Sequence, residues 1–178
     1  MKNIVKLLCR WKFLRISAGA IAGFIVLELG YYVLARVIFP LSAVRVMENL
    51  AEFQSIGRFD GKLKIITYNI CHGWGGDANK FKRDQKMIID RLHAVSAMLS
   101  DEKPDIAVLE EVDFDSLLTG RMNQAKYIAE KAGYPYWVEQ KNVDAQTLFA
   151  FSERNGNAVL SRYPISKAEL VIFPGHKK

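Results

Sequence analysis

Cysteine and histidine are scarce in this sequence, whose 178 residues include only two cysteines and three histidines. The two cysteines, Cys9 and Cys71, are too few for a disulfide-stapled scaffold or a multi-cysteine zinc site. No internal repeat is present, so neither a solenoid nor a propeller is predicted. Half of the residues are hydrophobic and a quarter are charged, a balance that predicts a folded chain rather than a disordered one.

Acidic side chains are absent from the first fifteen residues, which carry five basic ones. This leader accounts for +5 of the formal net charge of +6, so the rest of the chain is nearly neutral. Residues 61–178 hold 17 Lys and Arg against 15 Asp and Glu. The high isoelectric point therefore comes from the leader, and the charge balance gives no indication of a polyanionic DNA substrate for the folded part.

A long apolar run follows the basic leader. Residues 16–35 contain a single charged side chain, Glu28. A helix of this length is about 30 Å long, which matches the hydrocarbon core of a bilayer. We therefore expect a transmembrane helix over residues 16–39. The leader 1–15 is then cytoplasmic, and whatever follows Phe39 lies in the periplasm, in a lumen or outside the cell.

Two other interpretations of the apolar run are open. A cleaved secretory signal has a similar basic start, but its apolar core is usually only about 7–15 residues long. A buried core helix is disfavoured because the run has no polar face. A carboxylate in the middle of a membrane is costly, so we expect Glu28 to be protonated or to face a partner helix.

The segment after the apolar run predicts a connector and then a globular part. Val46, Leu50 and Phe53 recur at helical spacing, which predicts a short amphipathic helix within a connector over residues 40–61. We expect the globular part to occupy residues 62–178.

Strand and helix patterns alternate in the globular part, which predicts an α/β or α+β layered domain. The first strand, residues 63–70, is apolar on both faces, as in an interior strand. Two helices with one apolar face each are predicted over residues 81–100 and 116–131, and Gly133 is expected to cap the second. Four more strands are predicted over residues 106–112, 134–138, 157–160 and 169–173.

Two segments place polar side chains at the ends of predicted strands, where loops assemble sites. In TYNICHG, Asn69 is either a sheet-capping asparagine or a site residue. In PDIAVLEEVD, strand alternation places Glu111 on the same face as Ala107 and Leu109. A carboxylate there is costly unless it is paired or binds a metal, so a salt bridge and a Mg²⁺ ligand are both open.

A third segment, GNAVLSRYPI, opens with Gly-Asn and closes with Tyr-Pro, which is also ordinary punctuation for a strand. Its Arg162 either holds a phosphate or pairs with an internal carboxylate.

Together the three segments resemble the endonuclease/exonuclease/phosphatase superfamily. The resemblance rests on LKIITYNICHGWGGD, PDIAVLEEVD and GNAVLSRYPI in this order, and it covers residues 62–178. It implies a deoxyribonuclease I-like four-layered α/β sandwich with two mixed sheets between helices. It also implies hydrolysis of phosphoester bonds with Mg²⁺ or Mn²⁺.

The resemblance also implies roles for individual residues. Glu111 fills the acidic position of the family's LQEV motif and would bind the metal, while Glu110 replaces the usual glutamine. Asn69 would help to hold the metal or the phosphate. His72, Asn157 and Arg162 would contact substrate or phosphate.

The sequence departs from complete members of the family. Their second half carries a Gly-Asp-x-Asn motif and a terminal Ser-Asp-His motif, which position the attacking water and supply the catalytic histidine. Neither motif occurs in these 178 residues, and no aspartate precedes His176. We therefore identify no catalytic residue here and expect an incomplete sandwich that hydrolyses no phosphoester on its own.

The leading hypothesis is the N-terminal part of a membrane-anchored, metal-dependent phosphoester hydrolase that acts outside the cytoplasm. Its substrate would be a lipid phosphodiester, a nucleotide or a nucleic acid, and a separately encoded second half is a further expected partner. The alternative is a non-catalytic membrane-tethered module or a degenerate fragment. A transport component is disfavoured because a single span is predicted.

Overall fold

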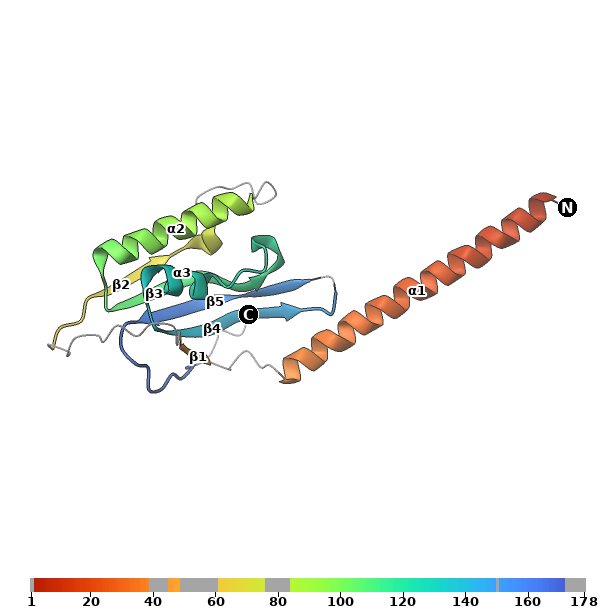
Figure 1. The fold of residues 1–178 in the computed structure, drawn as a ribbon. Helices are drawn as coiled ribbons and strands as arrows, with labels where there is room; N and C mark the ends of the chain where they lie inside the picture. The colour runs from red at the N-terminus through yellow and green to blue at the C-terminus, as the bar shows by residue number, and fades with distance from the viewer. Residues whose placement is uncertain (1, 39–44, 49–60, 76–83, 150, 172–178) are drawn as a thin grey trace, which may run out of the picture.

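A long N-terminal helix projects from a small α/β domain (Figure 1). The computed structural model describes residues 2–38, 45–48, 61–75, 84–149 and 151–171. Helix α1 runs over Lys2–Ile38, and its part Leu14–Ile38 is long and apolar enough to cross a membrane, with only 6% of that window buried. A membrane anchor and a signal sequence both have this length and composition, whereas a buried core helix is contradicted.

The domain is built on one mixed sheet with the strand order β1-β4-β5-β3-β2. Strands β2 (Ile65–Asn69) and β3 (Ile106–Ser116) are parallel and are joined by a helical crossover, as parallel neighbours require. Strands β4 (Tyr136–Gln146) and β5 (Ser152–Ser161) form an antiparallel hairpin, and β5 also pairs with β3. The predicted mixed α/β domain preceded by one apolar helix is confirmed.

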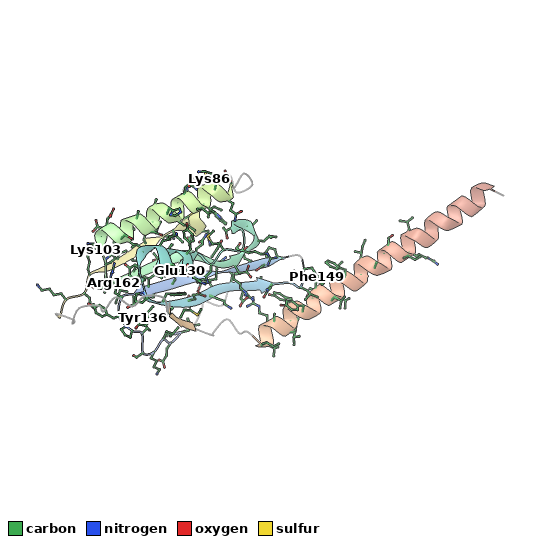
Figure 2. All side chains as sticks on the ribbon, in the orientation of Figure 1. Lys86, Lys103, Glu130, Tyr136, Phe149 and Arg162 are labelled. Carbon is green, nitrogen blue, oxygen red and sulfur yellow. The ribbon has the colours of Figure 1, made fainter. Side chains whose placement is uncertain are left out.

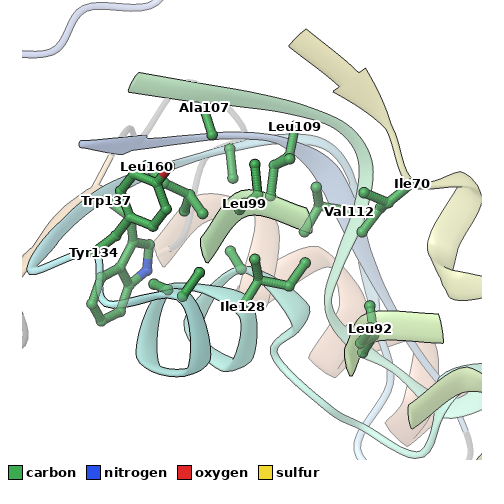
Figure 3. Close-up of a cluster of buried hydrophobic side chains, with 14 of the residues drawn as sticks. Ile70, Leu92, Leu99, Ala107, Leu109, Val112, Ile128, Tyr134, Trp137 and Leu160 are labelled. Atoms are coloured by element: carbon green, nitrogen blue, oxygen red, sulfur yellow. The ribbon is translucent and has the colours of Figure 1, made fainter. Parts of the chain in front are cut away.

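Two helices cover one face of the sheet, α2 (Gln85–Glu102) and α3 (Gln124–Ala132). The side chains of Asp84 and Asn123 cap their N-termini, and α3 ends at Gly133 in the left-handed conformation, as predicted. The core lies between these helices and the sheet (Figure 3), and its central side chains are Leu92, Leu99, Leu109, Val112, Ile128 and Leu160.

Two predicted helices differ from the structure. Strand β3 continues through Ser116 because it keeps pairing with β5, and a short 3-10 helix (Leu117–Thr119) separates it from α3. The predicted helix over 116–131 is therefore correct only in its second part. Within the connector, β1 (Arg45–Glu48) pairs with β4 rather than forming a helix. Residues 40–44 and 49–60 of the predicted connector lie outside the described residues.

The first and last predicted strands also differ from the structure. Strand β2 lies at the edge of the described sheet rather than inside it, and Ile65 and Tyr68 are 58% and 44% exposed. The apolar pattern of this segment predicts an interior strand, but within the described part of the chain β2 is an exposed edge strand. Residues 169–171 have no strand conformation, and residues 172–173 lie outside the described part.

A buried tyrosine gives the core a measurable pH dependence. The Tyr134 hydroxyl donates to the carbonyl oxygen of Pro104 at 2.9 Å. Burial raises the pKa of Tyr134 from its ordinary value of 10.0 to about 12, although the nearby Arg162 acts in the opposite direction. Because the folded state holds this proton more tightly, the resulting stability is complete below about pH 10 and is lost as pH rises toward about 12.

We expect Tyr134→Phe to lower the free energy of unfolding by about 1 kcal/mol at pH 8, through the lost hydrogen bond. Each unit of pKa difference corresponds to about 1.4 kcal/mol, so the two proteins should be equally stable near about pH 11. Urea denaturation of both proteins from pH 8 to 12 measures this difference. A difference that stays constant across the range would contradict the assignment.

Candidate active site

The loop that follows β2 is held in an unusual conformation. Cys71, His72 and Gly73 all have positive φ, at 49°, 53° and 72°. The Oδ1 atom of Asn69 accepts a hydrogen bond from the Cys71 backbone N–H at 2.8 Å, which fixes the start of the turn. Glycine is required at 73 because an added Cβ would lie 2.9 Å from Cγ2 of Ile88. The amide Nδ2 of Asn69 is then the group left to donate outward.

A β-bulge places two glutamates beside this loop. The pairing of β3 with β5 shifts register between Leu109 and Val112, and Glu111 takes a positive φ of 54°. Simple alternation predicts Glu111 on the face of Ala107 and Leu109, and this expectation is wrong. The bulge gives the next core position to Val112, and the Glu111 side chain is 48% exposed. No costly burial of this carboxylate occurs.

A hydrogen-bonded network braces His72 next to Glu111. The His72 Nδ1 atom lies 2.7 Å from Oδ1 of Asp113, and Thr119 donates its hydroxyl to the other oxygen of that buried carboxylate at 2.7 Å. A carboxylate only accepts hydrogen bonds, so Nδ1 carries the hydrogen. The Nε2 atom then faces Glu111 Oε2 at 3.8 Å. Gln124 closes the network by donating to the His72 carbonyl oxygen and accepting from the Asp113 N–H.

Sequence reasoning missed Asp113 in this network. Its signal is its position two residues after Glu111, on the same strand and beyond the bulge. Without knowledge of the bulge, the alternation of the strand gives no reason to place Asp113 beside His72.

The structure brings some of the other predicted site residues to this place and not others. Asn69 is aligned with Glu110 in the β2–β3 pairing, and Asn157 lies on β5 opposite the bulge. The Asn157 amide donates to Gln140 at 3.4 Å. Arg162 lies at the opposite end of the sheet (Figure 2), where its Nε donates to the Pro104 carbonyl oxygen and its guanidinium covers the Tyr134 ring. Arg162 is therefore not brought together with Glu111.

The donor groups at the bulge suit a hard divalent cation. Mg²⁺ in proteins is usually held by one or two carboxylates, while water and substrate phosphate complete the shell. Glu111 offers an exposed carboxylate, and no described lysine or arginine forms an ion pair with it. Within the described part of the chain, no three His, Cys, Asp or Glu side chains form a ready metal cluster. The residues thus fit a cation that shares its shell with substrate and do not form a closed structural metal site.

Comparison with known proteins identifies the family. Residues 66–177 match the sequence model of the endonuclease/exonuclease/phosphatase family. The chain belongs to this family, as the three motifs predict. No match is found among curated proteins.

Two solved structures are similar to part of the chain. An endonuclease/exonuclease/phosphatase from Beutenbergia cavernae DSM 12333 is 26% identical, with a TM-score of 0.42. A family protein from Leptotrichia buccalis C-1013-b is 19% identical, with a TM-score of 0.36. Each match covers 60% of this chain, which spans 27% of the first structure and 40% of the second.

Proposed function

We propose that this chain supplies the metal-binding part of the active site of a divalent-metal-dependent phosphoester hydrolase, held at a membrane by α1. The observation that carries this proposal is the position of Glu111. Its exposed carboxylate stands on a bulge, one residue after the Glu110 that pairs with Asn69 at the end of β2, and it lies 3.8 Å from a histidine that a buried aspartate braces.

Each residue has a distinct task in this proposal. Glu111 holds Mg²⁺ or Mn²⁺, and Asn69 donates its Nδ2 hydrogens to a phosphoryl oxygen because its Oδ1 already accepts from Cys71. His72 is a positioning residue, since its Nε2 faces the Glu111 carboxylate and its Nδ1 is held by Asp113. When bound, the cation supplies Lewis-acid stabilisation of the charge that develops on phosphate.

Residues 1–178 on their own should not turn over a phosphoester. A positioned general base contributes about 10²–10⁴ in rate, and the family's Gly-Asp-x-Asn and Ser-Asp-His motifs are absent from these residues. A second half, on the same or another chain, would provide that group.

The membrane part of the proposal rests on α1 and the basic leader. Five positive charges before the apolar segment favour a cytoplasmic N-terminus, which places the domain in the periplasm, in a lumen or outside the cell. The substrate class proposed there is a phosphoester of a lipid, a nucleotide or a nucleic acid.

The proposal is tested by measuring how substitutions at two neighbouring glutamates, Glu111 and Glu110, change the affinity for Mn²⁺. In Mn²⁺ titrations followed by electron paramagnetic resonance, we expect Glu111→Gln to weaken Mn²⁺ binding by at least about 10-fold, because it removes a direct ligand. Glu110→Gln is the matched control, since Glu110 is also exposed and family members carry glutamine there. It should change the affinity less than about twofold.

The same samples are assayed for hydrolysis of bis(p-nitrophenyl) phosphate, where residues 1–178 should give only background. An unchanged Mn²⁺ affinity in Glu111→Gln would refute the metal site. Turnover by the purified chain that is lost in Glu111→Gln would refute the proposed need for a second half.

A further inference from the structure

The tip of the β4–β5 hairpin contacts α1 at Glu28, the one charged residue of the apolar run over residues 16–35. We define the hairpin tip as Thr147, Leu148, Phe149 and Phe151. The N–H groups of Leu148 and Phe149 donate to the two carboxylate oxygens of Glu28 at 2.6 and 2.9 Å. Glu28 is only 8% exposed, whereas its helix neighbours Leu27 and Leu29 are 63% and 59% exposed. The hairpin tip therefore covers the carboxylate on an otherwise bare helix.

Apolar contacts accompany these hydrogen bonds. The ring of Phe149 stacks on that of Phe24 with centroids 6.4 Å apart, and Figure 2 shows Phe149 beside α1. The turn is closed by Thr147, whose backbone N–H donates to the Phe151 carbonyl and whose hydroxyl accepts from the Phe151 N–H. The remaining surface of the hairpin tip is apolar, since Leu148, Phe149 and Phe151 are 43%, 70% and 40% exposed.

The distance along α1 from Glu28 to the membrane interface is similar to the length of the hairpin tip that carries no charge. Glu28 precedes Arg36, the first charge beyond the apolar run, by eight residues, which is about 12 Å along a helix. The Arg36 guanidinium lies over the Tyr32 ring, an arrangement suited to the membrane interface. On the hairpin, Asp144 and Glu153 are the charges nearest to Phe149. Glu153 is four residues away, and β5 begins only at Ser152, so the part of the tip without charges reaches no more than about 13 Å beyond Glu153.

We propose that the hairpin tip enters the hydrocarbon layer of the bilayer beside α1, with Glu28 as its docking residue. The proposal rests on the membrane span in the proposed function. Two backbone N–H groups and a carboxylate would each be unsatisfied in hydrocarbon, and their pairing removes both penalties. The exposed leucine and phenylalanines face acyl chains. Glu28 therefore docks the chain's own hairpin rather than a separate partner helix.

This contact would fix the orientation of the domain on the membrane. Strands β4 and β5 are central in the sheet, and β5 carries Asn157 opposite the Glu111 bulge. A hairpin tip held both by Glu28 and by lipid would thus hold the candidate site at one orientation relative to the bilayer.

Depth-dependent fluorescence on the full chain in phosphatidylcholine–phosphatidylglycerol vesicles tests this proposal. Single cysteines replace Leu148, Asn142 and Ala22 in a Cys9→Ser, Cys71→Ser background, and each carries an NBD label. Asn142 lies on β4 outside the hairpin tip, and Ala22 lies on α1, so they report the exposed hairpin and the span. Lipids spin-labelled on their acyl chains should quench the Leu148 probe more than twofold over the Asn142 probe, and to the same extent as the Ala22 probe.

The docking role of Glu28 is tested in the same assay. Glu28→Leu, which keeps α1 apolar but removes both acceptors, should reduce quenching of the Leu148 probe at least twofold and leave the Ala22 probe unchanged. Glu28→Gln, which keeps one carbonyl acceptor, should give an intermediate value.

The outcomes separate this proposal from the proposed function. If the Leu148 probe is quenched no more than the Asn142 probe while the Ala22 probe is quenched, insertion of the hairpin tip is refuted and the anchor stands. Unchanged quenching of the Leu148 probe in Glu28→Leu refutes the docking role. If the Ala22 probe is not quenched, α1 does not span and both proposals of membrane contact fail, whereas the metal-binding test is unaffected.

Discussion

Replacing Gly156 by alanine is expected to prevent the sheet from forming in its present register. An added Cβ at this position would lie 1.9 Å from the carbonyl oxygen of Gln140 and 2.8 Å from the backbone nitrogen of Asn142. Both obstacles are backbone atoms of β4, so no side-chain rotation relieves the overlap. We expect a loss of at least about 3 kcal/mol in the free energy of unfolding, the upper end of overpacking costs.

The position of Gly156 explains this severity. Strand β5 passes here between two irregular neighbours, because β3 shifts register at Glu110–Glu111 and β4 shifts register around Asn142. The close approach of the β4 backbone leaves no room for a side chain. The Gly-Asn pair that opens the third sequence motif therefore has a steric reason, and the glycine lies directly beside the bulge that carries Glu111.

Gly133→Ala is the matched control for this experiment. Gly133 has a positive φ, at 72°, which Gly156 does not have, and an added Cβ at Gly133 meets nothing within 4 Å. It should cost only the left-handed strain of about 1–2 kcal/mol. Urea denaturation followed by circular dichroism measures both variants. Equal losses in the two variants would contradict the steric account of Gly156.

Loss of the Asp113 carboxylate is expected to give the second large effect. Asp113→Ala removes the acceptor of His72 Nδ1 and of the Thr119 hydroxyl, and leaves the hydroxyl only the Ser116 carbonyl oxygen at 3.4 Å. A buried donor that loses its partner costs about 1–3 kcal/mol, so we expect a loss of about 2–4 kcal/mol, most of it at His72. The His72 ring also loses the contact that aims Nε2 at Glu111, so Mn²⁺ affinity should fall by about 10-fold.

Asp115→Ala, two residues further along β3, is the matched control. Asp115 makes ion pairs with Arg121 and Arg154 at 3.9 and 3.8 Å and is partly exposed. Exposed pairs of this kind contribute about 1 kcal/mol or less, and Mn²⁺ affinity should be unchanged. If Asp113→Ala does not fold, Asp113→Asn retains one acceptor and allows the metal titration. Equal stability losses at positions 113 and 115, or unchanged Mn²⁺ affinity in the folded Asp113 variant, would contradict the bracing role.

The sequence predicts the elements whose patterns are local. The apolar stripe of Ile88, Leu92 and Leu99 gives α2, and Gly133 gives the end of α3, because periodicity and capping depend only on near neighbours. The edge position of β2 and the pairing of β1 with β4 are not local properties. They depend on which strands meet in space, and the helical spacing of Val46, Leu50 and Phe53 carries no information on that pairing.

The family motifs predicted which residues belong to the candidate site, but the sequence did not predict how their side chains are arranged. The family motifs single out Asn69 and Glu111, and the structure puts Asn69 at the end of β2, paired with Glu110, the residue that precedes Glu111 on β3. Alternation fails at Glu111 because a bulge inserts an extra residue, and a bulge leaves no clear mark in the sequence. Arg162 shares a motif with Asn157 but lies five residues further along the chain, so the extended strand carries it to the other end of the sheet.

The left-handed backbone at Glu111 costs conformational strain, so stability and the proposed chemistry favour different residues at this position. Glycine or asparagine would adopt a φ of 54° with less strain, so glutamate is favoured there only while its carboxylate has a task. Under the proposed function, replacement of Glu111 by glycine or asparagine in a homologue that no longer binds a metal would raise stability without loss of activity. The identity of residue 111 in diverged copies is therefore a natural record of whether the ancestral chemistry was still in use.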